Sequence, residues 1–181
     1  MKYLLENQET ERLLFRNIQP ADADQWIGFF TDSKTSLYWP ETKGTPEEEC
    51  RKWYNKQFDR YQNDLGGMNA LLEKASGALI GHAGLLVQEV DGQQELEIAY
   101  SLLPKFWKKG YALEAAQKCK TYAFENNFAE SLISIISLPN VPSQNVALKN
   151  GMTIEKQTHY KNIPVYIFRI FRSAALKKAY F

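Results

Sequence analysis

The sequence predicts a single α/β domain built on a mixed, largely antiparallel sheet. Three consecutive strand-like runs occupy the middle of the chain, and each is joined to the next by a short turn that contains glycine. Stretches with helical periodicity flank this region on both sides. The 181 residues suit one domain, 1–181, and the chain has no internal repeat or linker. The three central strands are expected at residues 68–74, 79–90 and 95–103.

The N-terminal part carries one strand signal and two helix signals. Residues 13–18 read as a first strand. Pro20 and the aspartates after it favour a helix start, and an apolar face follows. The second helix has the stronger signal, because Thr45-Pro46-Glu47-Glu48 combines a capping box with a proline at the first helical position. It is expected to run to about Asn63, and Gly66-Gly67 is expected to stop it.

The C-terminal half returns to alternating helices and strands. A long helix is expected over residues 110–126, and its small side chains form a smooth face suited to packing on a sheet. A fifth strand at 132–138, a short helix at 141–150 and a terminal hairpin around Asn162 complete the domain. The small side chains of the long helix are Ala112, Ala115, Ala116, Cys119 and Ala123.

Composition excludes several classes of protein. The chain has 22 basic and 21 acidic residues, so a net charge of +1 argues against a whole-chain polyanion binder. Two cysteines and two histidines without metal-binding spacing predict neither a disulfide framework nor a metal site. No signal-peptide core is present, and no apolar run approaches the ~20 residues of a membrane span. We therefore expect a cytoplasmic protein without a membrane partner.

The most informative segment is 105–114, a strand-to-helix junction. Three lysines surround Gly110, which lies near the expected first turn of the helix. Free backbone amides and the positive end of the dipole make a helix start an anion site. A plain loop with solvated lysines is the alternative. Neither of the common glycine-rich nucleotide motifs is present, so kinases, GTPases and Rossmann dehydrogenases lose support.

Two motifs carry a resemblance to a known family. The segment 109–116, together with Glu97-Ile98-Ala99-Tyr100 upstream, resembles the acetyl-CoA motif of the GNAT acetyltransferase superfamily. Residues 140–152 are similar to the N-x-x-S-x-x-V-x-x-K-x-G-M pattern of the branch that contains the ribosomal-protein N-terminal acetyltransferases. The resemblance covers about residues 9–169 and leaves a basic tail at 172–181. One departure is Trp107, which stands where the family pattern has Gln or Arg.

The resemblance implies a six- or seven-stranded sheet with splayed fourth and fifth strands and helices on both faces. Acetyl-CoA would lie between the splayed strands, with no metal required. Its pantetheine arm would pair with the backbone of the fourth strand and with the Asn140 side chain, and its pyrophosphate would lie on loop amides. The implied cofactor residues are Ser101, Leu102 and Leu103 on the strand, and Lys108, Lys109, Gly110, Tyr111, Ala112 and Leu113 on the loop.

The chemistry of acetyl transfer suggests the catalytic candidates. An attacking amine must be neutral, so a general base is useful. Glu97 is the candidate base, because strand alternation places it on one face of the strand that the cofactor would line; a solvated carboxylate is the alternative. Ser143 is the candidate donor to the leaving sulfur, with helix capping as its alternative. Tyr38 and Trp39 are expected in the wall of the acceptor site, although core packing would also explain them.

We therefore expect an N-acetyltransferase that transfers acetyl from acetyl-CoA to a primary amine by direct attack in a ternary complex. The acceptor is a protein N-terminus or a small amine, and a catalytically inactive CoA-binding regulatory or interaction module is the alternative. The expected partners are acetyl-CoA and the acceptor; nucleic acid is not expected, and a homodimer is left open. Basic residues concentrate at 105–120 and 161–181. The acidic remainder is compatible with a cationic acceptor.

Overall fold

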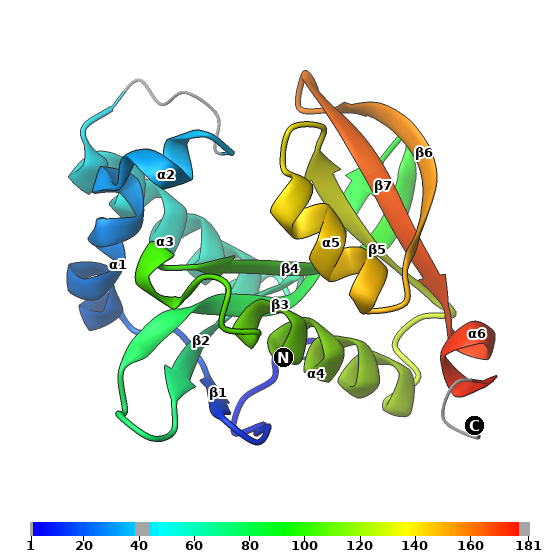
Figure 1. The fold of residues 1–181 in the computed structure, drawn as a ribbon, viewed down its shortest axis with the longest axis horizontal. Helices are drawn as coiled ribbons and strands as arrows, with labels where there is room; N and C mark the ends of the chain where they lie inside the picture. The colour runs from blue at the N-terminus through cyan, green and yellow to red at the C-terminus, as the bar shows by residue number, and fades with distance from the viewer. Residues whose placement is uncertain (1, 39–43, 178–181) are drawn as a thin grey trace.

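The computed structural model describes residues 2–38 and 44–177, which form a seven-stranded sheet with helices packed on it (Figure 1). The order of the strands in the sheet is β1-β2-β3-β4-β5-β7-β6. The strands are β1 (Leu13–Arg16), β2 (Gly66–Glu73), β3 (Leu79–Val90), β4 (Gln93–Leu102), β5 (Ser131–Ser137), β6 (Thr153–Tyr160) and β7 (Ile163–Phe171). The helices are α1 (Ala23–Thr31), α2 (Ser33–Ser36), α3 (Pro46–Gln62), α4 (Tyr111–Glu125), α5 (Val141–Lys149) and α6 (Arg172–Lys177), with short 3-10 turns η1 (Pro20–Asp22) and η2 (Pro104–Phe106).

The central feature of the sheet is the junction of β4 and β5. All other neighbouring strands pair antiparallel, whereas β4 and β5 run parallel and register at one residue pair, Glu97 with Ile133. Beyond that pair the two ribbons diverge, and α5 lies beside the opening (Figure 1). The predicted mixed α/β domain with splayed fourth and fifth strands is confirmed.

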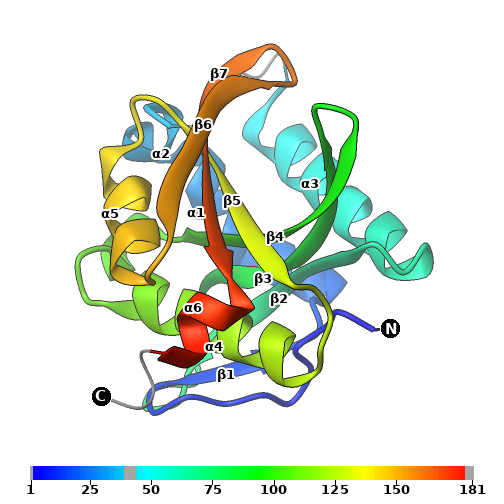
Figure 2. The same cartoon turned by 90° about the vertical axis from the view of Figure 1, so that its right-hand side faces the viewer.

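Helices cover both faces of the sheet. In Figure 2, α3 and α5 lie on opposite sides of the strands β5 and β7. Helices α1 and α3 pack on each other and contact β3 and β2 respectively, while α4 contacts β3 and β4. Four residues of the predicted small face of α4, namely Ala115, Ala116, Cys119 and Ala123, have no exposed surface, and Ala112 is half-buried. Small side chains bring the helix close to the strands.

The start of α3 follows the sequence signal. The Thr45 hydroxyl accepts a hydrogen bond from the Glu48 amide at 3.3 Å, and the Glu48 carboxylate accepts one from the Thr45 amide at 3.0 Å. This reciprocal pair is the predicted capping box, and it satisfies two amides that the helix cannot. The short helix α2 carried no comparable sequence signal and was not predicted.

Helix α3 ends at Gln62, one residue before the expected Asn63. Gly66 and Gly67, which were expected to stop the helix, are instead the first residues of β2. Gly66 has φ +66°, and a Cβ atom there would lie 2.0 Å from the carbonyl oxygen of Leu85. Gly66 therefore serves the close approach of β2 to β3, whereas a Cβ atom on Gly67 would meet the Tyr61 ring of α3 at 2.7 Å.

Gly66→Ala and Gly77→Ala separate backbone strain from this close approach. Gly77 has a similar φ of +69°, but a Cβ there meets nothing within 4 Å. Both changes incur about 1–2 kcal/mol of left-handed strain, and Gly66→Ala adds about 1–3 kcal/mol of overpacking. We expect urea denaturation to show the larger loss of unfolding free energy for Gly66→Ala. Equal losses would show that the contact with Leu85 relaxes without cost.

Candidate active site

The loop between β4 and α4 presents backbone amides at the start of a helix. Lys108 and Gly110 both have positive φ, +61° and +88°. Gly110 is the N-cap of α4 and supplies no side-chain cap, so the first amides of the helix have no partner within it. Successive amides in such a conformation form a concave anion site. Lys108 and Lys109 are exposed beside it.

Arg12 braces this loop from the N-terminal strand region. Its Nη1 donates to the carbonyl oxygen of Lys109 at 3.0 Å, and its Nε donates to the carboxylate of Glu114 at 2.7 Å. The same carboxylate accepts from the Arg12 amide and from the Thr10 hydroxyl, and the guanidinium lies 4.3 Å from the Tyr111 ring centroid. The conformation of the loop is therefore fixed by contacts with a segment about 100 residues earlier in the sequence.

Two aromatic side chains of this region are used to hold the loop. The Tyr111 hydroxyl donates to the carboxylate of Glu73, so only the backbone of Tyr111 remains at the anion site. The indole N–H of Trp107 donates to the carbonyl oxygen of Leu102 at 2.7 Å. Trp107, which departs from the family pattern, thereby ties the loop to the last residue of β4.

Alternation along β4 decides which backbone groups face the opening toward β5. The Leu103 amide donates to Ile80 of β3, and the Ser101 carbonyl oxygen also lies against β3, close to Gly81. The Ile98 carbonyl oxygen instead accepts from the Ser134 hydroxyl of β5 at 2.8 Å. Tyr100 and Leu102 share the orientation of Ile98. Of the three strand residues predicted to bind the cofactor, only Leu102 thus turns its backbone toward the opening.

Tyr100, which sequence reasoning did not single out, spans the opening between the strands. Its hydroxyl donates to the carbonyl oxygen of Ser143 on α5 at 2.9 Å. Asn140 caps α5, because its side-chain oxygen accepts from the Ser143 amide at 3.1 Å. The capping role that was the alternative for Ser143 therefore belongs to Asn140, and Ser143 lies in the first turn of α5, half-buried. The sequence signal that could have indicated Tyr100 was its position among the residues of β4 whose backbone faces β5.

Glu97 lies where β4 and β5 meet, and it is only 8% exposed. One carboxylate oxygen accepts from the side-chain amide of Gln88 at 2.6 Å, and the other accepts from the Ile135 amide of β5 at 3.4 Å. Burial raises the pKa of Glu97 above its ordinary value, although these hydrogen bonds and the charges of Arg60 and Lys161 oppose the increase. The alternative of a solvated carboxylate is wrong for this residue.

Glu95, two residues earlier on β4, has a different role. It forms a two-pronged ion pair with Arg169 of β7, with N–O distances of 2.6 and 3.0 Å. This pair links β4 to the C-terminal hairpin. The two carboxylates of β4 therefore differ: Glu95 is paired with a cation, and Glu97 is bonded to neutral amides.

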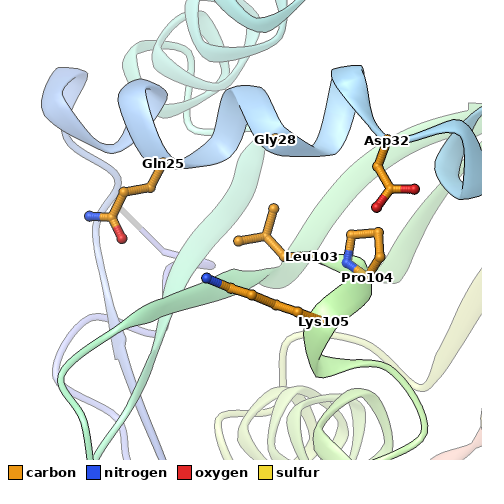
Figure 3. A pocket seen from close by; sticks show the side chains of 6 residues that line it. All are labelled: Gln25, Gly28, Asp32, Leu103, Pro104 and Lys105. Carbon is orange, nitrogen blue, oxygen red and sulfur yellow. The ribbon is translucent and has the colours of Figure 1, made fainter.

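The two expected acceptor-wall residues are only partly described. Tyr38 is half-buried, and its ring centroid lies 6.3 Å from that of Trp107. Trp39 lies outside the described residues. Nearby, a pocket of about 190 Å³ opens between α1 and the loop after β4, and the side chain of Leu103 points into it (Figure 3). This volume is below the roughly 300 Å³ typical of ligand pockets, so it is no groove for a nucleotide cofactor.

The comparisons with known proteins identify the family. A model described as the acetyltransferase (GNAT) domain matches residues 12–153. The uncharacterized N-acetyltransferase YnaD of Bacillus subtilis (strain 168) is 30% identical over 146 residues, which cover 81% of this chain and 82% of YnaD. The chain belongs to the GNAT acetyltransferase family, and it is an N-acetyltransferase that uses acetyl-CoA.

Solved structures share the fold. A GNAT-family acetyltransferase from Bacillus anthracis superposes with a TM-score of 0.73 at 26% identity, covering 94% of this chain and 99% of that one. A RimL ribosomal L7/L12 alpha-N-protein acetyltransferase in complex with coenzyme A gives a TM-score of 0.72 at 16% identity, covering 93% and 98%. The second likeness concerns the fold alone.

In residues 2–38 and 44–177, no helix is both long and apolar enough to span a membrane. Within the same part of the chain, no three His, Cys, Asp or Glu side chains group as metal ligands would.

Glu114→Gln should weaken the brace at neutral pH. Although burial alone would raise its pKa, the hydrogen bonds from Thr10 and Arg12 lower the pKa of Glu114 overall. Its stabilisation is therefore present above the ordinary pKa of a glutamate and is lost as the pH falls through the lowered one. We expect a loss of about 1–2 kcal/mol in unfolding free energy at pH 7, and a smaller difference in acid.

Urea denaturation at pH 7 and at about pH 3.5 tests this. Glu9→Gln is the control, because Glu9 pairs with Lys74 at the surface and should contribute at most about 1 kcal/mol. A Glu114→Gln loss that is the same at both pH values would contradict the role of the carboxylate charge.

Proposed function

We propose that the chain transfers acetyl from acetyl-CoA to a primary amine by direct attack within a ternary complex, with Glu97 as general base. The observation that carries this proposal is the buried Glu97 carboxylate at the single residue pair joining β4 and β5. A protein N-terminus and a small amine are both candidate acceptors. The likeness to RimL concerns the fold, so it does not choose between them.

The loop before α4 suits the diphosphate of acetyl-CoA. Lys108, Lys109 and the uncapped amides of residues 110–113 offer positive charge and N–H donors at one place. The pantetheine arm would then follow the opening toward α5, where Tyr100 and Leu102 turn their backbone toward β5. Asn140 would contribute through its side-chain amide nitrogen, since its oxygen already caps α5.

Glu97 would accept the proton that the amine loses as its nitrogen bonds to the thioester carbon. The raised pKa suits this role, because a base is more effective when its pKa approaches the working pH. Gln88 fixes one carboxylate oxygen through a hydrogen bond from its side-chain amide. The hydrogen bond with Ile135 aligns the carboxylate with the junction of the strands.

Ser143 would donate a hydrogen bond to the sulfur as the carbon–sulfur bond breaks and the thiolate of CoA leaves. Its amide and carbonyl groups are held by Asn140 and Tyr100, so the hydroxyl sits on a fixed backbone at the opening. A thiol with a pKa near ~8.5 needs little help to leave at neutral pH, so this contribution is smaller than that of Glu97.

Glu97→Gln should lower kcat by about 10²–10⁴-fold while acetyl-CoA affinity stays unchanged, because the amide cannot accept the proton. The pH profile of kcat should lose the ionisation of the Glu97 carboxylate and retain that of the acceptor amine. For a carboxylate with a raised pKa, activity in the wild type increases as the pH rises through that pKa.

Thiol release with acetyl-CoA and a panel of amines measures the rates, and calorimetry measures the affinity. Glu95→Gln is the matched control on the same strand, and it should reduce stability through Arg169 more than it reduces rate. Unchanged turnover in Glu97→Gln would refute the base. Binding of acetyl-CoA without turnover of any amine by the wild type would favour the inactive CoA-binding module.

Gly110→Glu should weaken acetyl-CoA binding by about tenfold or more, through bulk and charge repulsion at the diphosphate. Gly92→Glu is the control, because Gly92 also has positive φ but lies in an open turn where a Cβ meets nothing within 4 Å. Calorimetry that gives both variants wild-type affinity would contradict the loop assignment.

A further inference from the structure

Two segments that are far apart in the sequence are anchored beside Glu97, on adjacent residues of β3. From α3, Nη2 of Arg60 donates to the carbonyl oxygens of Val87 and Leu65, at 2.5 and 2.9 Å. From the β6–β7 hairpin, the Tyr160 hydroxyl donates to the side-chain oxygen of Gln88 at 2.8 Å. The amide of the same Gln88 side chain donates to Glu97. Helix α3 and the hairpin therefore face the buried carboxylate together.

Each anchor brings a lysine with it. Lys56 precedes Arg60 by one helical turn and shares its face of α3. Lys161 follows Tyr160 at the tip of the hairpin, and its ammonium group lies 5.0 Å from the Tyr160 ring centroid. Lys56 as a residue is exposed. Its pKa is nevertheless lowered to about 8, mainly because its ammonium group is partly buried, and also because of contact with Lys161 and repulsion from Arg60.

This group of charges is unbalanced. Several other basic side chains pair with carboxylates, as Arg169 does with Glu95 and Arg12 with Glu114. Among the described residues, no carboxylate lies within ion-pair distance of Lys56 or Lys161. The charge of Glu97 acts on Lys56, and the carboxylate oxygens of Glu97 are already bonded to Gln88 and Ile135.

Three cations around one carboxylate disfavour an acceptor whose only charges are positive. A polyamine would bring additional ammonium groups to Lys56, Lys161 and Arg60, and like charges repel one another. An anionic group on the acceptor would pair with the two free ammonium groups instead. The charges next to Glu97 are thus opposite to the acidic surroundings that the overall charge distribution suggested.

We propose that Lys56 and Lys161 form an anion subsite beside Glu97, and that the acceptor is an amine that carries a carboxylate a few bonds from its nitrogen. This inference rests on the proposed role of Glu97 in acetyl transfer. The carboxylate is either the α-carboxylate of a free amino acid or an acidic side chain next to the N-terminus of a peptide.

Matched acceptor pairs test the proposal with the full-length protein. Free glutamate and alanine are compared with their α-carboxamides, and Ala-Glu-amide is compared with Ala-Gln-amide, by thiol release from acetyl-CoA. We expect kcat/KM to favour the carboxylate member of one pair by about tenfold or more. The first comparison identifies a free amino acid as the source, and the second identifies a peptide N-terminus.

The variants then separate substrate binding from support of Glu97. In Lys56→Gln/Lys161→Gln, the preference for the carboxylate member should fall to about threefold or less, while the carboxamide keeps its rate. Lys52→Gln is the control, because Lys52 lies on α3 in a surface pair with Glu49. If the lysines merely keep Glu97 ionised, both members of each pair lose rate equally and the acidic limb of kcat moves to higher pH; that result overturns the proposal.

Two further outcomes also decide it. Equal rates within both pairs, or faster turnover of spermidine than of every carboxylate-bearing amine, would overturn the anion subsite while leaving acetyl transfer in place. If calorimetry shows acetyl-CoA binding but no amine in the panel is acetylated, the proposed function fails, and the inference fails with it.

Discussion

The junction of β4 and β5 is the constraint on which the site depends. The two parallel strands meet at Glu97 and Ile133, and the carboxylate of Glu97 accepts from the next available amide of β5, that of Ile135. Farther along, the backbone groups of β4 that face β5 have no strand to pair with, and of these the Leu102 carbonyl oxygen accepts from the Trp107 indole instead. A buried amide or carbonyl without a partner is costly, so this edge favours an extended ligand that can supply the missing hydrogen bonds. One local irregularity thereby places this open edge and a buried carboxylate together.

Near the junction with β5, the side chains of β4 reach toward different elements on the two faces of the sheet. Tyr100 reaches α5 on one side, whereas Glu97 faces α3 and the β6–β7 hairpin on the other. A cofactor bound along α5 and an acceptor admitted beside α3 would approach each other from opposite sides. This arrangement suits attack of one bound substrate on another without a covalent enzyme intermediate.

Much of the fold was predictable because its signals are local. The capping box of α3, the small face of α4 and the turns around Gly77 and Gly92 each depend on a few neighbouring residues. Gly66 was misread because a glycine that ends a helix and one that admits a close neighbour look alike in sequence. Only the position of Leu85, 19 residues later, distinguishes them.

The loop before α4 and the candidate base Glu97 could be proposed from sequence motifs. The contacts that hold and surround them could not. Nothing in the sequence pairs Gln88 with Tyr160, or Lys56 with Lys161, because these contacts depend on how distant segments cross the sheet. The same holds for the backbone of β4, where strand pairing decides that Leu102 and not Leu103 faces the opening.

The brace of Arg12 on the loop before α4 has a consequence for the order of folding. The Arg12 amide and the Glu114 carboxylate are 102 residues apart, so their contact closes a long segment of chain and carries a large entropic cost. Contacts of this separation form late, after the local turns and helices. A nascent or partly unfolded chain would thus hold most of its secondary structure before it could hold the nucleotide, and fraying of the N-terminal segment would release ligand without global unfolding.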